Sequence, residues 1–315
     1  MSGFAYVVRD GAARLVAIED ALGQRGNLVW VHLTTNNDHA KEWLGGAAKL
    51  SDYVTEALTA SETRPRCDAV DEGAVINLRG LSSEKMEASD PLASIRIYAH
   101  HGRVFSVTRK PLDALVRVRE QIEAGEVADP GDLIAAIADE ITEELDPMVA
   151  RLGDSLDACE TRIETTRAFK LRRMVNQVRG QAIGYRRFLN PQRGALEKLA
   201  QLSGKWLAED DRLKLNAAAD RAARMAEELE SIRERAALTH ETLTDLRAEM
   251  LDQRSLVIAI VAMVFLPLTF VTGLFGMNVP LPFSHAPSAF WWITLICLLL
   301  AAAITAYFMR RHWFR

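Results

Sequence analysis

Charge is missing from most of the last fifth of the chain. Residues 255–309 contain no Lys, Arg, Asp or Glu, and His285 is their only histidine. All 38 basic and 42 acidic residues of the 315-residue chain lie outside this block, and the net charge is -4. This division excludes a uniformly soluble protein and predicts a polar body followed by a membrane-embedded end.

Cysteine is scarce, and the common catalytic motifs are absent. Cys67, Cys159 and Cys297 are far apart and form no CxxC, which excludes a disulfide framework and a thiolate zinc site. There is no GxxxxGK[ST], no GxGxxG and no defensible Ser/His/Asp set. We therefore expect no enzyme, no catalytic residue, no cofactor and no nucleotide or nucleic-acid partner. Residues 1–11 lack the pattern of a signal peptide.

Two uncharged runs are each long enough to cross a bilayer. Residues 256–277 and 286–309 both exceed the roughly 20 residues that a membrane-spanning helix needs. They predict a first transmembrane helix at 255–278, an external loop at 279–289, a second transmembrane helix at 290–309 and a basic tail at 310–315. A lipid bilayer is therefore an expected partner.

The basic residues around these runs predict the orientation. The loop 279–289 has no Lys or Arg, whereas Arg310, Arg311 and Arg315 follow the second run and Arg254 precedes the first. Because cytoplasmic flanks carry the excess of Lys and Arg, we expect both termini in the cytoplasm. The interpretation is a multi-pass protein of the inner (plasma) membrane.

The polar body divides into a mixed part and a helical part. Residues 1–130 predict a cytoplasmic α/β domain, in which helical pattern fills residues 39–58. Short apolar or alternating runs separated by Gly, Asp and Asn predict its strands, at 4–8, 14–18, 28–33, 75–78, 95–98 and 104–108. A helical region at 131–207 follows, with helices expected at 132–166 and 168–202.

A stalk helix is predicted at 208–254, because no Pro occurs between residue 208 and Pro267. Continued to residue 275, it would be on the order of 100 Å long. Its apolar residues form a heptad seam, namely Met225, Leu229, Ile232, Ala236, Thr239, Leu243, Leu246 and Met250. Packing within the chain and contact between subunits explain this seam equally well.

Charge is segregated along the helical region. Residues 132–164 hold ten acidic residues against two arginines, whereas residues 165–196 hold eight basic residues and no acidic one. One interpretation is two solvated faces that pair with each other, each pair contributing little. The other is an acidic sleeve that concentrates cations or faces the basic tail at 310–315.

Four motifs carry a resemblance to a known family. The first run contains Phe265-Leu266-Pro267-Leu268-Thr269-Phe270 and ends in Gly276-Met277-Asn278, and the α/β part contains Trp30-Val31-His32-Leu33 and Glu62-Thr63-Arg64-Pro65-Arg66. Together with the long stalk and the basic tail, they resemble the CorA superfamily of divalent-cation transporters, in its ZntB-like branch. The resemblance covers essentially the whole chain.

The resemblance implies a CorA-like homopentamer: an α/β cytoplasmic domain, a long α-helical stalk and two C-terminal transmembrane helices. It implies transport of divalent metal cations, with Zn2+ as the ion and protons as the coupling ion. Many ZntB-like chains have Gly-Gly after the Asn, but here Val279 and Pro280 follow. A Mg2+ channel of the CorA type, gated by cytoplasmic Mg2+, is therefore the alternative, and a membrane-anchored coiled-coil scaffold is the rival from another class.

The resemblance also implies that the first span lines the pore. Helical spacing back from Gly276 then gives a pore-lining stripe of Gly273, Thr269, Leu266, Ala262, Ile258 (or Ala259) and Ser255, with Asp252 at its cytoplasmic end. Within the membrane this stripe offers none of the ligands that hold Zn2+ directly. We therefore expect hydrated ions, met at the entrance by Gly276, Met277 and Asn278, with the Asn278 amide as an outer-sphere ligand.

Ionisable residues at the two ends of the pore are the remaining candidates. Glu241, Asp245 and Asp252 are spaced by four and seven, so a five-fold bundle would turn each into a carboxylate ring that attracts cations or regulates opening. His285, in the external loop, and Asp252 are the candidate proton carriers. The pair His100-His101 is not expected to bind metal, because adjacent strand residues point to opposite faces.

Overall fold

The structure, a computed structural model, describes residues 2–34, 38–61, 64–84, 91–163, 168–277 and 288–312. The chain forms two compact units, Met1–His240 and Glu241–Arg315. One helix, α7 (Glu209–Phe275), begins in the first unit and ends in the second.

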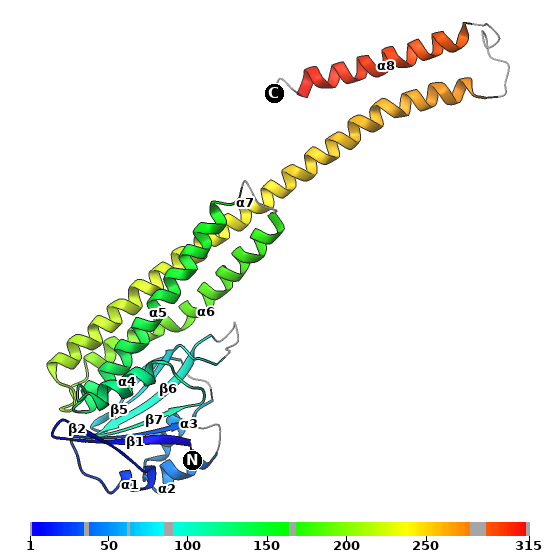
Figure 1. Ribbon diagram of the computed structural model, residues 1–315. Coiled ribbons are helices and arrows are strands. Elements are labelled where there is room, and N and C mark those ends of the chain that lie inside the picture. Colours follow the sequence, from blue (N-terminus) through cyan, green and yellow to red (C-terminus); the bar gives the residue numbers. More distant parts are fainter. Residues whose placement is uncertain are drawn as a thin grey trace. The chain divides into compact units, whose positions relative to one another are not determined.

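A seven-stranded mixed sheet forms the centre of the first unit (Figure 1). In the order β2-β1-β3-β7-β6-β5-β4, only β3 and β7 pair in parallel. The strands are β1 (Ser2–Arg9), β2 (Ala12–Val16), β3 (Leu28–Thr34), β4 (Arg66–Val70), β5 (Gly73–Gly80), β6 (Ala93–His100) and β7 (Arg103–Thr108). Asp10-Gly11 and His101-Gly102 have positive φ at both positions, which a tight two-residue hairpin turn requires.

One face of the sheet is covered by α1 (Ile18–Ala21), α2 (Asp38–Gly46) and α3 (Asp52–Thr59), whose apolar side chains share a core with β1, β3, β5 and β7. The helical pattern predicted over 39–58 is thus divided between two helices, α2 and α3. The chain breaks between α2 and α3, where Lys49 has a φ of 54°. Ser51 then caps α3, because its side chain accepts a hydrogen bond from the backbone N–H of Val54.

Three further helices pack against the rest of the sheet: α4 (Ala114–Glu123), α5 (Pro130–Glu160) and α6 (Ala168–Ala200). Asp129 fixes the start of α5, since its carboxylate accepts hydrogen bonds from the N–H groups of Gly131 (2.8 Å) and Asp132 (3.0 Å). With Pro130 in its first turn, α5 begins two residues before the predicted start.

The heptad seam of α7 is buried inside the chain over most of its length. From Met225 to Leu243 its six residues are at most 6% exposed. Leu246 is half-buried and Met250 is 43% exposed. Packing within the chain therefore explains the seam as far as Leu243, and beyond that point its apolar side chains remain available to another molecule.

Ion pairs tie α7 to the acidic helix α5. Arg221 pairs with Asp139 and Glu143, and Arg235 pairs with Asp157 and Glu160. The interpretation that the acidic and basic segments pair with each other is thus wrong for these carboxylates, whose partners lie on α7.

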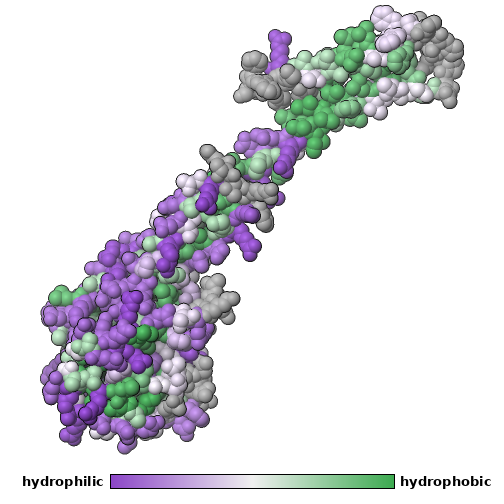
Figure 2. Space-filling view, viewed as in Figure 1, coloured by the Kyte–Doolittle hydropathy of each residue, from purple (hydrophilic) through white to green (hydrophobic). Residues whose placement is uncertain are grey.

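The second unit contains the end of α7 and α8 (Ala289–His312). Both helices have an apolar window long enough to cross a membrane, and no side chain in either window is buried within the chain. Hydrophobic side chains gather over these two segments (Figure 2), whereas polar ones dominate the surface of the first unit. Such exposure fits a lipid-facing hairpin.

Candidate functional site

The predicted pore stripe is exposed along its whole described length. Ser255, Ala262, Thr269, Gly273 and Gly276 all lie on the surface of the chain. The two large members are the most open: Leu266 and Ile258 are each 69% exposed. Within one chain, none of the residues that the structure describes covers this side of α7.

A different side of α7 is partly covered. Its half-buried residues are Ile260, Val264, Pro267, Leu268 and Val271. In α8 the half-buried residues also repeat at helical spacing, at Ile293, Thr294, Cys297, Leu300, Ala301 and Ile304. This is the pattern of two helices packed as a hairpin. At 3.6 residues per turn, the centre of the predicted stripe lies about 170° around α7 from its half-buried side.

The polar chemistry of the stripe comes from hydroxyls and backbone. The Thr269 hydroxyl donates a hydrogen bond to the Phe265 carbonyl (2.8 Å), which leaves its oxygen lone pairs free to accept. Space around Gly273 is open, since a Cβ there would meet no atom within 4 Å. The stripe thus offers small residues and weak acceptors.

The outer end of the stripe coincides with the end of α7. The Gly276 N–H donates to the Thr272 carbonyl (2.9 Å), and the helix stops at Phe275. The last carbonyls of a helix have no partner within it and form the negative end of its dipole. This end therefore favours a cation. The predicted residues Asn278 and His285 lie outside the described part of the chain.

The predicted carboxylates lie on one exposed side of α7. Glu241, Asp245 and Asp252 are all exposed. On an ideal helix they fall within about 40° of one another and about 85° from the centre of the pore stripe. Across the described ranges, no three His, Cys, Asp or Glu side chains converge well enough to hold a metal ion. In the predicted tail, Arg310 is exposed, whereas the Arg311 side chain and Arg315 are not described.

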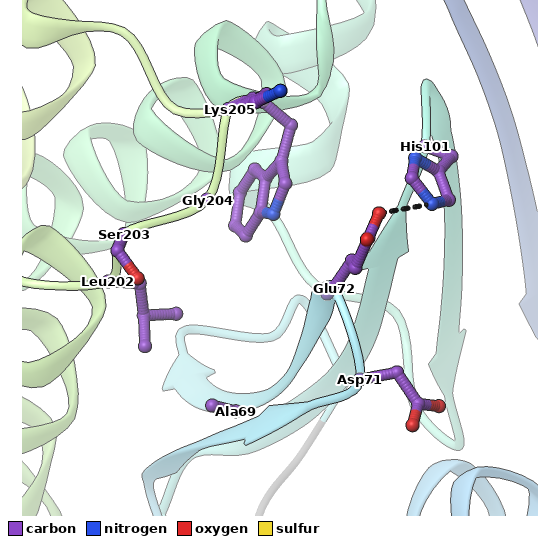
Figure 3. A pocket seen from close by; sticks show the side chains of 10 residues that line it. Ala69, Asp71, Glu72, His101, Leu202, Ser203, Gly204 and Lys205 are labelled. Atoms are coloured by element: carbon purple, nitrogen blue, oxygen red, sulfur yellow. Dashed lines mark ion pairs between the residues drawn. The ribbon is translucent and has the colours of Figure 1, made fainter.

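A separate cavity of about 450 Å3 lies in the first unit (Figure 3). Glu72, between β4 and β5, points toward His101, and their carboxylate and Nε2 are 2.8 Å apart. The connection between α6 and α7 forms the other wall, where the Trp206 indole packs onto Gly204. Sequence reasoning missed this cavity, because its walls are more than 100 residues apart in the chain.

His100 and His101 do not lie together on one strand, as the prediction assumed. His101 lies in the turn after β6 with a φ of 44°, not on the strand. The two rings consequently approach to 4.0 Å between centroids instead of pointing to opposite faces.

Comparison with known proteins identifies relatives along the full chain. Residues 25–311 match the family described as CorA-like Mg2+ transporter protein. The divalent cation transporter CmaX of Pseudomonas aeruginosa is 32% identical over 98% of this chain and 96% of its own. The zinc transport protein ZntB of Pectobacterium atrosepticum is 27% identical over 90% and 87%. The structure of full-length CmaX superimposes with a TM-score of 0.82 at 29% identity, covering 98% of this chain and 97% of that one.

Proposed function

This chain belongs to the CorA-like family of divalent-cation transporters, and we propose that Zn2+ is the ion it carries, through a homopentameric pore. The family consists of transporters and not of enzymes, so the ion is cargo and no cofactor is needed. One observation carries this proposal. The predicted pore stripe of α7 is exposed, and it lies opposite the side of α7 that faces α8.

The position of the stripe supports assembly from several copies. A single hairpin cannot enclose a path, because its stripe faces away from α8. Copies arranged around an axis would bring their stripes together and leave α8 toward lipid. The number five rests on the resemblance to the CorA superfamily.

The residues of the stripe support passage of hydrated ions. Zn2+ bound directly prefers about four ligands from His, Cys, Asp or Glu side chains, and residues 255–277 contain none of these residues. Thr269 hydroxyls, helix-end carbonyls and the Asn278 amide would contact the water shell of the ion. Leu266 and Ile258 would form apolar constrictions that close the path by dewetting.

The Mg2+ channel is the second candidate function. The family description names Mg2+, and Mg2+ keeps its water and prefers oxygen ligands. Glu241, Asp245 and Asp252 are exposed carboxylates on one side of α7. Rings of them would bind cytoplasmic Mg2+ and regulate opening.

The proposed orientation places both termini in the cytoplasm, from the arginines that flank the two spans. A negative interior then favours entry of a divalent cation by about 4.6 kcal/mol per 100 mV, twice the single-charge value. Coupling to protons would use His285 and Asp252, at the two ends of the path.

Flux into proteoliposomes tests the choice of ion. Purified protein is compared for Zn2+ and Mg2+ uptake, each with and without an inward proton gradient. Zinc uptake that the proton gradient accelerates supports the proposal. Magnesium uptake that ignores the gradient and stops with internal Mg2+ contradicts it and supports the second candidate.

A further inference from the structure

The basic helix α6 carries a basic triplet on its outer side, made of Arg179, Ile183 and Arg187. Each of these residues follows the one before it by four positions, so the three lie along one side of the helix. Ile183 is 48% exposed, Arg187 is exposed and Arg179 is half-buried. Across the described ranges the ion pairs of α6 are made by other residues, and neither arginine of the triplet makes one.

The acidic helix α5 carries an acidic triplet with the same spacing, made of Asp146, Ala150 and Asp154. All three residues are exposed. Other carboxylates of α5 make its ion pairs, and among the described residues Asp146 and Asp154 have none. Arg151, the basic residue between them, lies about 100° around the helix from Ala150. The two triplets therefore match in spacing, opposite in charge and with a large apolar side chain to meet a small one.

The two triplets point away from each other within one chain. The helices α5, α6 and α7 run side by side (Figure 1), and the ion pair between Arg186 and Glu230 (3.0 Å) joins α6 to α7. Leu152 and Tyr185, on the opposite sides of α5 and α6 from the triplets, are each 7% exposed. Because the buried sides of the two helices face a shared interior, their outer sides diverge.

We propose that the basic triplet of α6 docks onto the acidic triplet of α5 on a second copy of this chain. This contact presupposes the assembly of several copies that the proposed function requires. Charge complementarity identifies the occupant, because α6 has no acidic residue from 168 to 196 and the chain itself carries the matching acidic face. A ring needs such a heterologous contact, in which each copy offers two different faces.

The direction of the helices sets the pairing. The helices α5 and α6 run in opposite directions, and rotation about an axis along them keeps that relation between copies. Arg179 would then meet Asp154, Arg187 would meet Asp146, and Ile183 would cover Ala150. Two α6 faces or two α5 faces would bring like charges together, so the triplets favour a ring over a two-fold dimer. Each exposed ion pair contributes little, but a copy leaves a ring only when two junctions break.

Disulfide cross-linking of the full-length protein in detergent tests the contact. In a variant free of the three native cysteines, Ile183→Cys and Ala150→Cys are combined in one chain and oxidised with copper phenanthroline. We expect a ladder of covalently linked oligomers, whereas either cysteine alone should give none, because the contact joins two different faces. Met174→Cys combined with Ala150→Cys is the matched control and should give no ladder. Met174 is 43% exposed but lies about 180° around α6 from Ile183.

Charge reversal tests the pairing with the native cysteines in place. Arg179→Glu combined with Arg187→Glu should lower the ratio of assembled to dissociated chains about tenfold, measured by light scattering on dilution. Adding Asp146→Arg and Asp154→Arg should restore the ratio, which a loss of folding would not allow. Arg173→Glu is the control, because Arg173 is exposed on α6 but lies about 80° from Ile183; it should assemble as the native protein does.

The contact is ruled out if the native protein assembles but the Ile183 and Ala150 cysteines give no ladder. It is also ruled out if the reversed acidic triplet fails to rescue the reversed basic one. Either result leaves the proposed function standing when native assemblies carry Zn2+. A ladder from assemblies that carry no divalent cation would support the contact and contradict the proposed function.

Discussion

A buried carboxylate joins the starts of two helices in the first unit. Asp211, in the first turn of α7, is 1% exposed, and its Oδ2 accepts the backbone N–H of Ala208 at 2.8 Å. Gly131, in the first turn of α5, packs directly against this carboxylate. A Cβ at Gly131 would collide with Asp211 and lie 2.8 Å from the Trp206 carbonyl oxygen.

Gly131→Ala should therefore destabilise the protein, by about 1–3 kcal/mol, the usual range for overpacking. Gly180→Ala in α6 is the matched control, because a Cβ there meets nothing within 4 Å. That change should stabilise by roughly 0.5–1 kcal/mol, since Ala loses less backbone entropy than Gly in a helix. Thermal unfolding of both variants checks this, and a Gly131→Ala variant as stable as Gly180→Ala would refute the packing argument.

The same carboxylate predicts a pH dependence. Burial, with Asp129 and Asp132 adding to it, raises the pKa of Asp211 from 3.8 to about 6. The folded state thus binds the proton more tightly than the unfolded state, so its advantage is complete below about pH 4 and lost as pH rises through 6.

Asp211→Asn removes the charge and keeps an acceptor for Ala208. Relative to the native protein it should gain up to about 2 kcal/mol between pH 4 and pH 7. The difference in Tm between the two proteins, followed across that range, measures this. A difference that does not change with pH would show that Asp211 titrates normally.

At the scale of elements, we expect cysteine labelling to affect ion flux differently on the two sides of α7. In a variant free of its three cysteines, single cysteines are placed at Ala262, Leu266 and Thr269 on the stripe. If ions pass along this side, a membrane-impermeant cationic thiol reagent should block flux at each of these positions. Ile260→Cys and Val264→Cys, on the side facing α8, are the controls and should keep their flux. Equal block on both sides would contradict the assignment of the stripe.

Local sequence patterns predicted most of the helices and strands. Features that were not predicted depend on contacts between residues far apart in the chain or on an unusual backbone conformation. The membrane-spanning runs needed only composition, because residues 255–309 lack charge. The strand β4 (Arg66–Val70) was missed, since its alternation is weak and its place depends on pairing with β5. The break between α2 and α3 was also missed, because a non-glycine residue, Lys49, takes the left-handed conformation.

Sites formed by residues far apart in the chain could not be predicted from the sequence alone. The stripe of α7 could be predicted because its residues lie on one helix. The cavity lined by Glu72, His101 and Trp206 depends on contacts between segments more than 100 residues apart in the chain. The partners of the α5 carboxylates could not be predicted either, since charge patterning alone does not identify α7 as the helix that supplies Arg221 and Arg235.

At the scale of the whole molecule, the proposed pore requires several chains acting together. The first unit buries its own core and most of the α7 seam, whereas the α7 stripe in the second unit is exposed in one chain. A transporter of this family would complete that surface with copies of itself. We propose that ions then pass along the stripe and meet Asn278 at its outer end.

The most direct test of this claim is the Zn2+ and Mg2+ flux of Asn278→Leu in proteoliposomes, beside the native protein and with oligomer size measured for both. Leu has the same branched shape as Asn and as many side-chain heavy atoms, but no amide oxygen to contact a hydrated ion. We expect flux to be lost while the native oligomer still forms at native yield. Undiminished flux through Asn278→Leu would contradict it, and a native protein that passes neither ion would instead support a membrane-anchored scaffold.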